Sequence, residues 1–256
     1  VYAYDDGGRR TSLQLPNGVV TLYMYDANDR LTSLTTKKGG AVLAGFQYTL
    51  DAVGNRTGID LANGQKIRYA FDDAYRLTAE ERKDPAGATV YNETFEYDAV
   101  GNRIKQVKNG VETLSTYNEN NQLVQSVTAG VTTRYFYDLS GNNIRIVKPG
   151  EVTRMTYDEL NRMTLWRQTG GGAPKTERHI YRGAEWHRMG VVANGSAKAF
   201  LYDGDNVVAD MVNTGGAMTV ESFYVTPFLD QNLSLTRGGA TYWYTQDGLG
   251  SVRKVT

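Results

Sequence analysis

The heptapeptide Tyr-Asp-Ala-Val-Gly-Asn-Arg at Tyr97–Arg103 recurs, with variations, along most of the chain. Asp51–Arg56 repeats its last six positions letter for letter, and Tyr157–Arg162 keeps its Tyr, Asp and Arg. The positions that carry this signature are Tyr25, Asp26, Arg30, Asp51, Gly54, Asn55, Arg56, Phe71, Asp72, Arg76, Tyr97, Asp98, Gly101, Asn102, Arg103, Tyr137, Asp138, Gly141, Tyr157, Asp158 and Arg162. A unit that recurs at regular spacing predicts an array of like elements.

A second family of turns lies roughly midway between these signatures. Asn17-Gly18, Asn63-Gly64, Asn109-Gly110 and Asn194-Gly195 are its clearest members, and Asn-Gly between alternating segments is a strong hairpin signal. A repeat of about 20–25 residues then holds two strands of about six residues and two turns. The sequence therefore predicts an all-β fold, a long antiparallel meander of about 20 short strands.

Aromatic and β-branched residues alternate in the strands that enter the Tyr-Asp turns, as in Thr133, Tyr135 and Tyr137. We expect the aromatic residues of successive units to stack across the sheet. After the turn, apolar residues recur at a spacing of three, as in Ile104 and Val107, which indicates a β-bulge or a strong twist. The turn Asp should accept backbone N–H bonds, and the Arg should pair with it or with a neighbouring unit.

The composition narrows the function classes. The 28 basic and 28 acidic residues balance and are interspersed. A nucleic-acid binder normally shows a basic stripe, so the charge pattern does not indicate nucleic-acid binding. The chain has no Cys, which excludes disulfides and thiolate chemistry. No apolar run approaches the ~20 residues of a membrane span. The chain begins at Val1 without an initiating Met, so we expect a piece of a longer polypeptide.

Each candidate site in the sequence has a plain structural role. His179 and His187 have no partner cluster, and we expect a strand and a loop position for them. Asp203–Asp210 lacks the ligand spacing of a Ca²⁺ loop and favours a hairpin turn, as does Gly170–Gly172. The sequence therefore predicts no catalytic, metal-binding or cofactor-binding residue, and no cofactor. Exposed tyrosines would suit stacking on sugar rings, and glycan binding is kept as an alternative.

The motif residues resemble the YD repeat of Rhs proteins, toxin complex C proteins, wall-associated proteins and teneurins. The end of the chain, Tyr242–Arg253, resembles the start of the Rhs-associated core, with Tyr244, Asp247, Leu249, Gly250, Ser251 and Arg253 as the matching positions. Two histidines of the family pattern are replaced by Thr245 and Gly248. Any role of those histidines therefore does not carry over.

The resemblance implies a sheet that curves or spirals into part of a hollow β-shell, which encloses a C-terminal toxin or effector domain in bacterial members. The family's autoprotease would lie downstream, so we expect a non-catalytic structural segment of a secreted or cell-surface bacterial protein. Expected partners are the rest of the shell, its toxin domain and, through exposed strand edges, further copies of the chain. We expect neither a nucleic-acid partner nor a membrane span.

Three segments are expected within the array: regular repeats at 1–165, degenerate repeats at 166–240 and the core motif at 241–256. Two alternatives stay open at this point. The first is a β-propeller, because two repeats approach the ~40–45 residues of one blade. The second is a cell-surface adhesin or carbohydrate-binding protein.

Overall fold

The computed structural model describes residues 1–183, 186–227 and 232–256, and all regular structure in these residues is β-strand. The meander of short strands predicted from the Asn-Gly and Tyr-Asp turns is confirmed. The strands of the described residues are β1 (Tyr2–Tyr4), β2 (Arg10–Gln14), β3 (Val19–Tyr25), β4 (Leu31–Lys38), β5 (Ala41–Leu50), β6 (Arg56–Leu61), β7 (Lys66–Phe71), β8 (Leu77–Lys83), β9 (Thr89–Tyr97), β10 (Arg103–Lys108), β11 (Val111–Tyr117), β12 (Leu123–Thr128), β13 (Val131–Tyr137), β14 (Asn143–Lys148), β15 (Glu151–Tyr157), β16 (Met163–Gly170), β17 (Lys175–Tyr181), β18 (Arg188–Ala193), β19 (Ser196–Asp203), β20 (Asn206–Thr214), β21 (Ala217–Val225), β22 (Ser234–Arg237), β23 (Ala240–Gln246) and β24 (Val252–Val255).

Each strand pairs antiparallel with its neighbour in the chain from β1 to β9, from β11 to β22, and from β23 to β24. A β-propeller would separate the strands into four-stranded blades. Here β4 pairs with β5, β8 with β9, β12 with β13 and β16 with β17, across every such boundary. The propeller alternative is therefore wrong.

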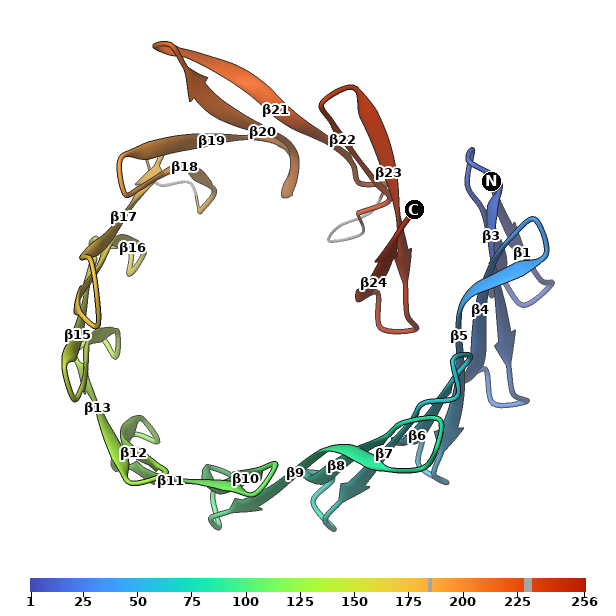
Figure 1. Ribbon diagram of the computed structural model, residues 1–256, viewed down its shortest axis with the longest axis horizontal. Coiled ribbons are helices and arrows are strands. Elements are labelled where there is room, and N and C mark those ends of the chain that lie inside the picture. The colour runs from blue at the N-terminus through green and yellow to red at the C-terminus, as the bar shows by residue number, and fades with distance from the viewer. Residues whose placement is uncertain (184–185, 228–231) are drawn as a thin grey trace. The chain divides into compact units, whose positions relative to one another are not determined.

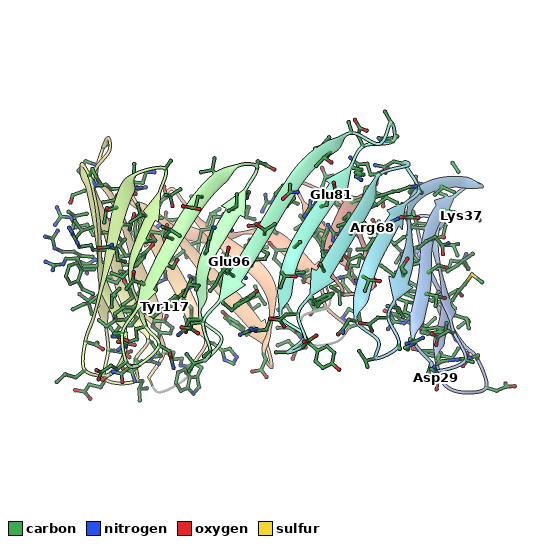
Figure 2. The ribbon with its side chains drawn as sticks, turned by 90° about the horizontal axis from the view of Figure 1, so that it is seen from below. Asp29, Lys37, Arg68, Glu81, Glu96 and Tyr117 are labelled. Atoms are coloured by element: carbon green, nitrogen blue, oxygen red, sulfur yellow. The ribbon has the colours of Figure 1, made fainter. Side chains whose placement is uncertain are left out.

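The chain divides into two compact units. Unit 1 consists of Val1–Glu96, Gln106–Val111 and Tyr242–Thr256, and unit 2 of Tyr97–Lys105 and Glu112–Thr241. Within unit 2, the strands from β11 to β19 follow a curve (Figure 1). Within unit 1, strands β3 to β8 carry side chains on both sides of the ribbon (Figure 2).

The main apolar cluster lies in unit 1. Leu34, Phe46, Tyr48 and Ile59 are buried there, and Tyr23, Leu31, Leu61, Ile67 and Tyr69 are among the partly buried residues that pack against them. These residues come from β3 to β7, where the C-terminal hairpin β23–β24 also packs. A single layer of strands buries little apolar area by itself, so a core forms where a second layer covers it.

A β-bulge marks the strand pairing at the following turns of the repeat. The register shifts between Met24 and Tyr25, Thr49 and Leu50, Phe136 and Tyr137, and Thr156 and Tyr157. A bulge of the kind inferred from the apolar spacing of three is thereby confirmed at these four turns, and for Ile104 and Val107 in β10 it stays a prediction. No described residue belongs to a helix long and apolar enough to cross a membrane.

Candidate functional site

The Tyr-Asp turn is built around the Asp carboxylate. Asp98 Oδ1 accepts the N–H bonds of Val100 at 3.1 Å and Asn102 at 2.8 Å. The backbone closes the same loop, because Asp98 N–H donates to the Asn102 carbonyl and Gly101 N–H to the Asp98 carbonyl. Gly101 has a φ of 98°, a left-handed value that glycine adopts without steric cost. The turn is thus fixed by its own Asp and its own Gly.

The same carboxylate bonds recur wherever the signature predicted a turn. Oδ1 of Asp26, Asp51, Asp72, Asp138 and Asp158 accepts N–H bonds from the residues two and four positions on. Oδ1 of Asp5, after Tyr4, accepts the same bonds from Gly7 and Arg9. Asn118 supplies an amide oxygen in the same role.

The second carboxylate oxygen binds the side chain four positions on. Arg30, Arg76 and Arg162 each donate from Nε to that oxygen at 2.7 Å, so the expected Asp–Arg pairs are confirmed for these three units. In the turns of Asp51, Asp98 and Asp138, the fourth position is an asparagine, Asn55, Asn102 or Asn142. Arg56 and Arg103 therefore follow their turn Asp by five positions, whereas Arg30 follows Asp26 by four.

These donors hold the turn carboxylates in their charged form. The backbone N–H of the fourth residue is the largest influence that lowers the pKa of Asp5, Asp26 and Asp72. The side-chain hydrogen bonds of Asn102 and Asn142 are the largest influence that lowers the pKa of Asp98 and Asp138. The side-chain hydrogen bond of Arg162 has this role for Asp158. Burial opposes the shift at Asp51, where the Asn55 donors outweigh it. A carboxylate whose pKa is lowered by its structural donors suits a structural joint better than acid–base work near neutral pH.

The tyrosines of the signature join each unit to the one before it. The hydroxyls of Tyr117, Tyr137 and Tyr157 donate to the carbonyls of Arg103, Leu123 and Asn143, each at 2.9–3.0 Å. Tyr25 and Tyr202 make the same bond to Arg10 and Arg188. This contact was not predicted, because the acceptor is a backbone atom that any residue supplies.

We expected the aromatic residues of successive units to stack on one another. A further strand lies between the strands that carry them. Signature tyrosines lie on every second strand, about 9.6 Å apart at a strand spacing of ~4.8 Å. Arginines on the intervening strands lie over the rings, as Arg10 does at 4.8 Å from the Tyr2 centroid and 5.7 Å from that of Tyr23. Where these contacts occur, the ladder alternates tyrosine with arginine.

The C-terminal motif forms the same kind of turn. Asp247 Oδ1 accepts the N–H bonds of Leu249 and Ser251, and Gly250 has a φ of 81°. Arg253, six positions on, binds Asp247 Oδ2 through Nε at 2.7 Å and Nη2 at 2.6 Å. Gln246 stands here in place of the tyrosine that precedes the Asp in the repeats. Tyr244 lies two residues before Gln246 in β23, and it pairs with Val255 of β24.

The hairpin packs on β4 and β5 within unit 1. Gly248 N–H donates to the Tyr48 hydroxyl at 2.9 Å, and a Cβ at position 248 would lie 2.6 Å from Leu31 Cδ2. Thr245 is only 3 % exposed. Thr245 and Gly248, the two positions that depart from the family pattern, are thus closely packed, and both hold small residues.

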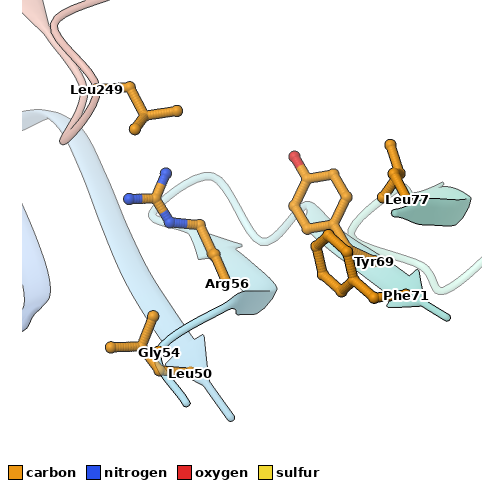
Figure 3. Close-up of a pocket in the computed structure, with 7 residues that line it drawn as sticks. All are labelled: Leu50, Gly54, Arg56, Tyr69, Phe71, Leu77 and Leu249. Carbon is orange, nitrogen blue, oxygen red and sulfur yellow. The ribbon is translucent and has the colours of Figure 1, made fainter. Parts of the chain in front are cut away.

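A pocket of about 460 Å³ lies beside the hairpin in unit 1. Its lining residues are Leu50, Gly54, Arg56, Tyr69, Phe71, Leu77 and Leu249 (Figure 3). Burial raises the pKa of the Tyr69 hydroxyl, which keeps it neutral. Arg56 is the only charged residue in the lining. Sequence reasoning took Arg56 for a turn residue and did not find the pocket.

The two histidines have different partners. His179 is buried in β17, where burial and then the Arg188 charge lower its pKa. His187 lies before β18, and its Nε2 is 3.0 Å from Asp205 Oδ1. Asp203 and Asn206 flank the turn between β19 and β20, the hairpin that was expected there. The described residues hold no group of three or more His, Cys, Asp or Glu side chains placed to bind a metal.

Fold and site together define a tandem array of antiparallel hairpins, each closed by an Asp-capped turn and tied to its neighbour by a tyrosine. Residues 4–41 match the family model described as RHS Repeat, and the same turn continues beyond them. The match supports the resemblance to the Rhs/YD-repeat family that the motifs indicated. A comparison with curated protein sequences gave no match.

Solved structures of Tc toxins share this fold. One is described as the Photorhabdus luminescens Tc holotoxin pore with the mutation TccC3-D651A, and matches with 14 % identity and a TM-score of 0.54 over 100 % of this chain. Two crystal structures, of TcdB2-TccC3-TEV and TcdB2-TccC3, match with 14 % identity and TM-scores of 0.56 and 0.55 over 98 % and 100 % of this chain. The present chain spans 17 % of the length of each matched chain.

Proposed function

We propose that this chain is a non-catalytic segment of the wall of an Rhs-type shell, which encloses a C-terminal toxin or effector domain in its parent protein. The observation that supports this proposal is the repeated Asp-capped turn, together with the likeness of the whole chain to part of a toxin-complex chain. Its turn carboxylates are held ionised by structural donors, which supports a scaffold role over acid–base catalysis.

The shell proposal carries further expectations. The parent is exported from a bacterium to the medium or the cell surface, and its partners are the remaining shell and the enclosed domain. Residues 1–165, 166–240 and 241–256 are its regular repeats, degenerate repeats and core motif. Exposed strand edges of the isolated chain would pair with further copies.

Protease protection in the parent protein tests the enclosure. The domain downstream of residue 256 should resist a protease concentration that digests the same domain expressed alone. Deletion of residues 1–96 should remove a section of wall and make the downstream domain sensitive again. Equal digestion with the wall intact and with the wall deleted would show that this chain shields nothing.

Glycan binding is the functional competitor. The signature tyrosines use their hydroxyls inside the array, as Tyr137 does toward Leu123, which favours the structural role over sugar stacking. A glycan array probed with the chain should stay blank. Binding that disappears with Tyr→Ala changes on one face of the sheet would instead support the adhesin.

A further inference from the structure

The pocket beside the hairpin has apolar walls and one cation. Leu50, Tyr69, Phe71 and Leu77 come from the strands β5, β7 and β8, and Leu249 comes from the turn of the hairpin. In Figure 3, the Arg56 side chain points toward the side on which Leu249 lies. Its volume of about 460 Å³ falls among those of small-molecule sites, about 300–1,000 Å³.

Arg56 reaches the pocket because of a one-residue difference in its turn. In the turns of Asp26 and Asp72, the fourth residue is an arginine that binds the Asp. In the turn of Asp51, Asn55 takes that place and donates its amide to Asp51 at 2.8 Å. The arginine then falls at the first position of β6, and its guanidinium lies 4.0 Å from the centroid of the Tyr48 ring.

The guanidinium of Arg56 has no counter-ion among the described residues. Its Nε is buried without a hydrogen-bond partner, whereas Arg30, Arg76 and Arg162 each bind a carboxylate. Arg253, on the hairpin that covers this face, is already paired with Asp247. A partly buried cation without an anion is unfavourable, and an anion placed beside it is stabilised.

We propose that this pocket binds a small organic carboxylate with an aromatic or branched aliphatic body. The carboxylate would accept the hydrogen bonds of Arg56, since a guanidinium fork matches that planar anion. The body would lie against Leu50, Phe71 and Leu77. Inorganic phosphate would leave these apolar walls uncovered and would meet a single cation, so it fits the site less well.

Calorimetric titration of the full chain with 4-phenylbutyrate tests the proposal. The acid should bind at a ratio of one to one. The uncharged analogue 4-phenylbutyramide should bind about tenfold more weakly or worse, since each 1.4 kcal/mol of lost interaction is a factor of ten. Arg56→Gln should weaken the acid by a similar factor and leave the weak binding of the amide unchanged.

Arg103→Gln is the matched control, because Arg103 also follows the turn asparagine but is exposed and lies outside the pocket lining. It should bind the acid as the unmodified chain does. Should Arg56→Gln fail to fold, Arg56→Lys keeps the charge without the fork and should bind the acid more weakly than the native chain. Equal binding of acid and amide, no binding of the acid, or an undiminished affinity in both Arg56 variants would overturn the proposal.

Discussion

The backbone N–H of Gly248 donates a hydrogen bond of 2.9 Å to the hydroxyl oxygen of Tyr48, across 200 positions of sequence. Tyr48 is a buried residue of the core in unit 1, and Gly248 lies in the turn between β23 and β24. The contact therefore attaches the last hairpin, as a second layer, to the strand that carries Tyr48. It also requires the backbone at position 248 to approach closely.

Replacement of Gly248 by alanine should loosen this attachment. The new Cβ would lie 2.6 Å from Leu31 Cδ2 and 2.9 Å from the Tyr48 hydroxyl, and overpacking of this kind costs about 1–3 kcal/mol. Denaturant unfolding should show the loss, and hydrogen exchange should quicken in β23 and β24. In a Leu31→Ala background the same change should cost less, because its nearest obstacle is gone. An equal cost in both backgrounds would locate the strain elsewhere.

Removal of one inter-unit hydroxyl should weaken the array. Tyr137→Phe deletes the donor to the Leu123 carbonyl at 2.9 Å, and a typical hydrogen bond contributes about 0.5–1.5 kcal/mol. Urea unfolding should report a loss of that size without a change in the slope. Tyr4→Phe is the control, because Tyr4 is 53 % exposed and makes no hydrogen bond through its hydroxyl among the described residues. Equal losses in the two variants would contradict a special role for the inter-unit bond.

The array should lose stability in acid. The folded pKa of seven turn carboxylates lies below the ordinary value of 3.8. Their contribution is therefore complete above that value and disappears as the pH falls through the lower folded pKa. Unfolding midpoints in urea should hold between pH 7 and about 5 and fall steeply below pH 3.8.

Asparagine at a turn position offers the matched test of this acid effect. Asn118 makes the same backbone bonds as the aspartates, so Asp98→Asn should keep the turn at neutral pH. Its unfolding midpoint should depend less on pH in the acid range than that of the native chain. An unchanged acid transition in a variant with several such replacements would show that other groups govern it.

Glycine at position 75 should stabilise unit 1. Tyr75 has a φ of 60° and is 60 % exposed, and the left-handed conformation costs a non-glycine residue roughly 1–2 kcal/mol. Tyr75→Gly should thus gain up to about 1 kcal/mol after the higher chain entropy of glycine is counted, measured by thermal and urea unfolding. Ala74→Gly, one residue earlier at an ordinary φ, should only lose stability. A loss in both would mean that the Tyr75 side chain contributes more than its backbone costs.

The repeat pattern was sufficient to predict the strands, their antiparallel order and the turns, because Asp, Gly and Asn at fixed offsets act through local bonds. Asp98 and Gly101 needed no distant partner to be recognised. The bond from Tyr137 to Leu123 could not be predicted in this way, because its acceptor is a backbone carbonyl that any residue supplies. The predicted stacking of tyrosines on one another also left out the strand that lies between them. Nor could the local pattern place Arg56, since its pocket depends on Leu249 from the far end of the chain. Long-range packing decided the place of Arg56, which the pattern could not supply.

The tyrosine bonds of the described residues reach back to the repeat before, as from Tyr137 to Leu123 and from Tyr157 to Asn143. During synthesis, each new repeat therefore finds its acceptor already made, and the sheet can grow from the amino terminus as the chain leaves the ribosome. The same offset makes whole repeats interchangeable modules. Duplication or deletion of a complete repeat by recombination restores every such bond, whereas a single inserted residue inside a turn breaks the bonds of that turn.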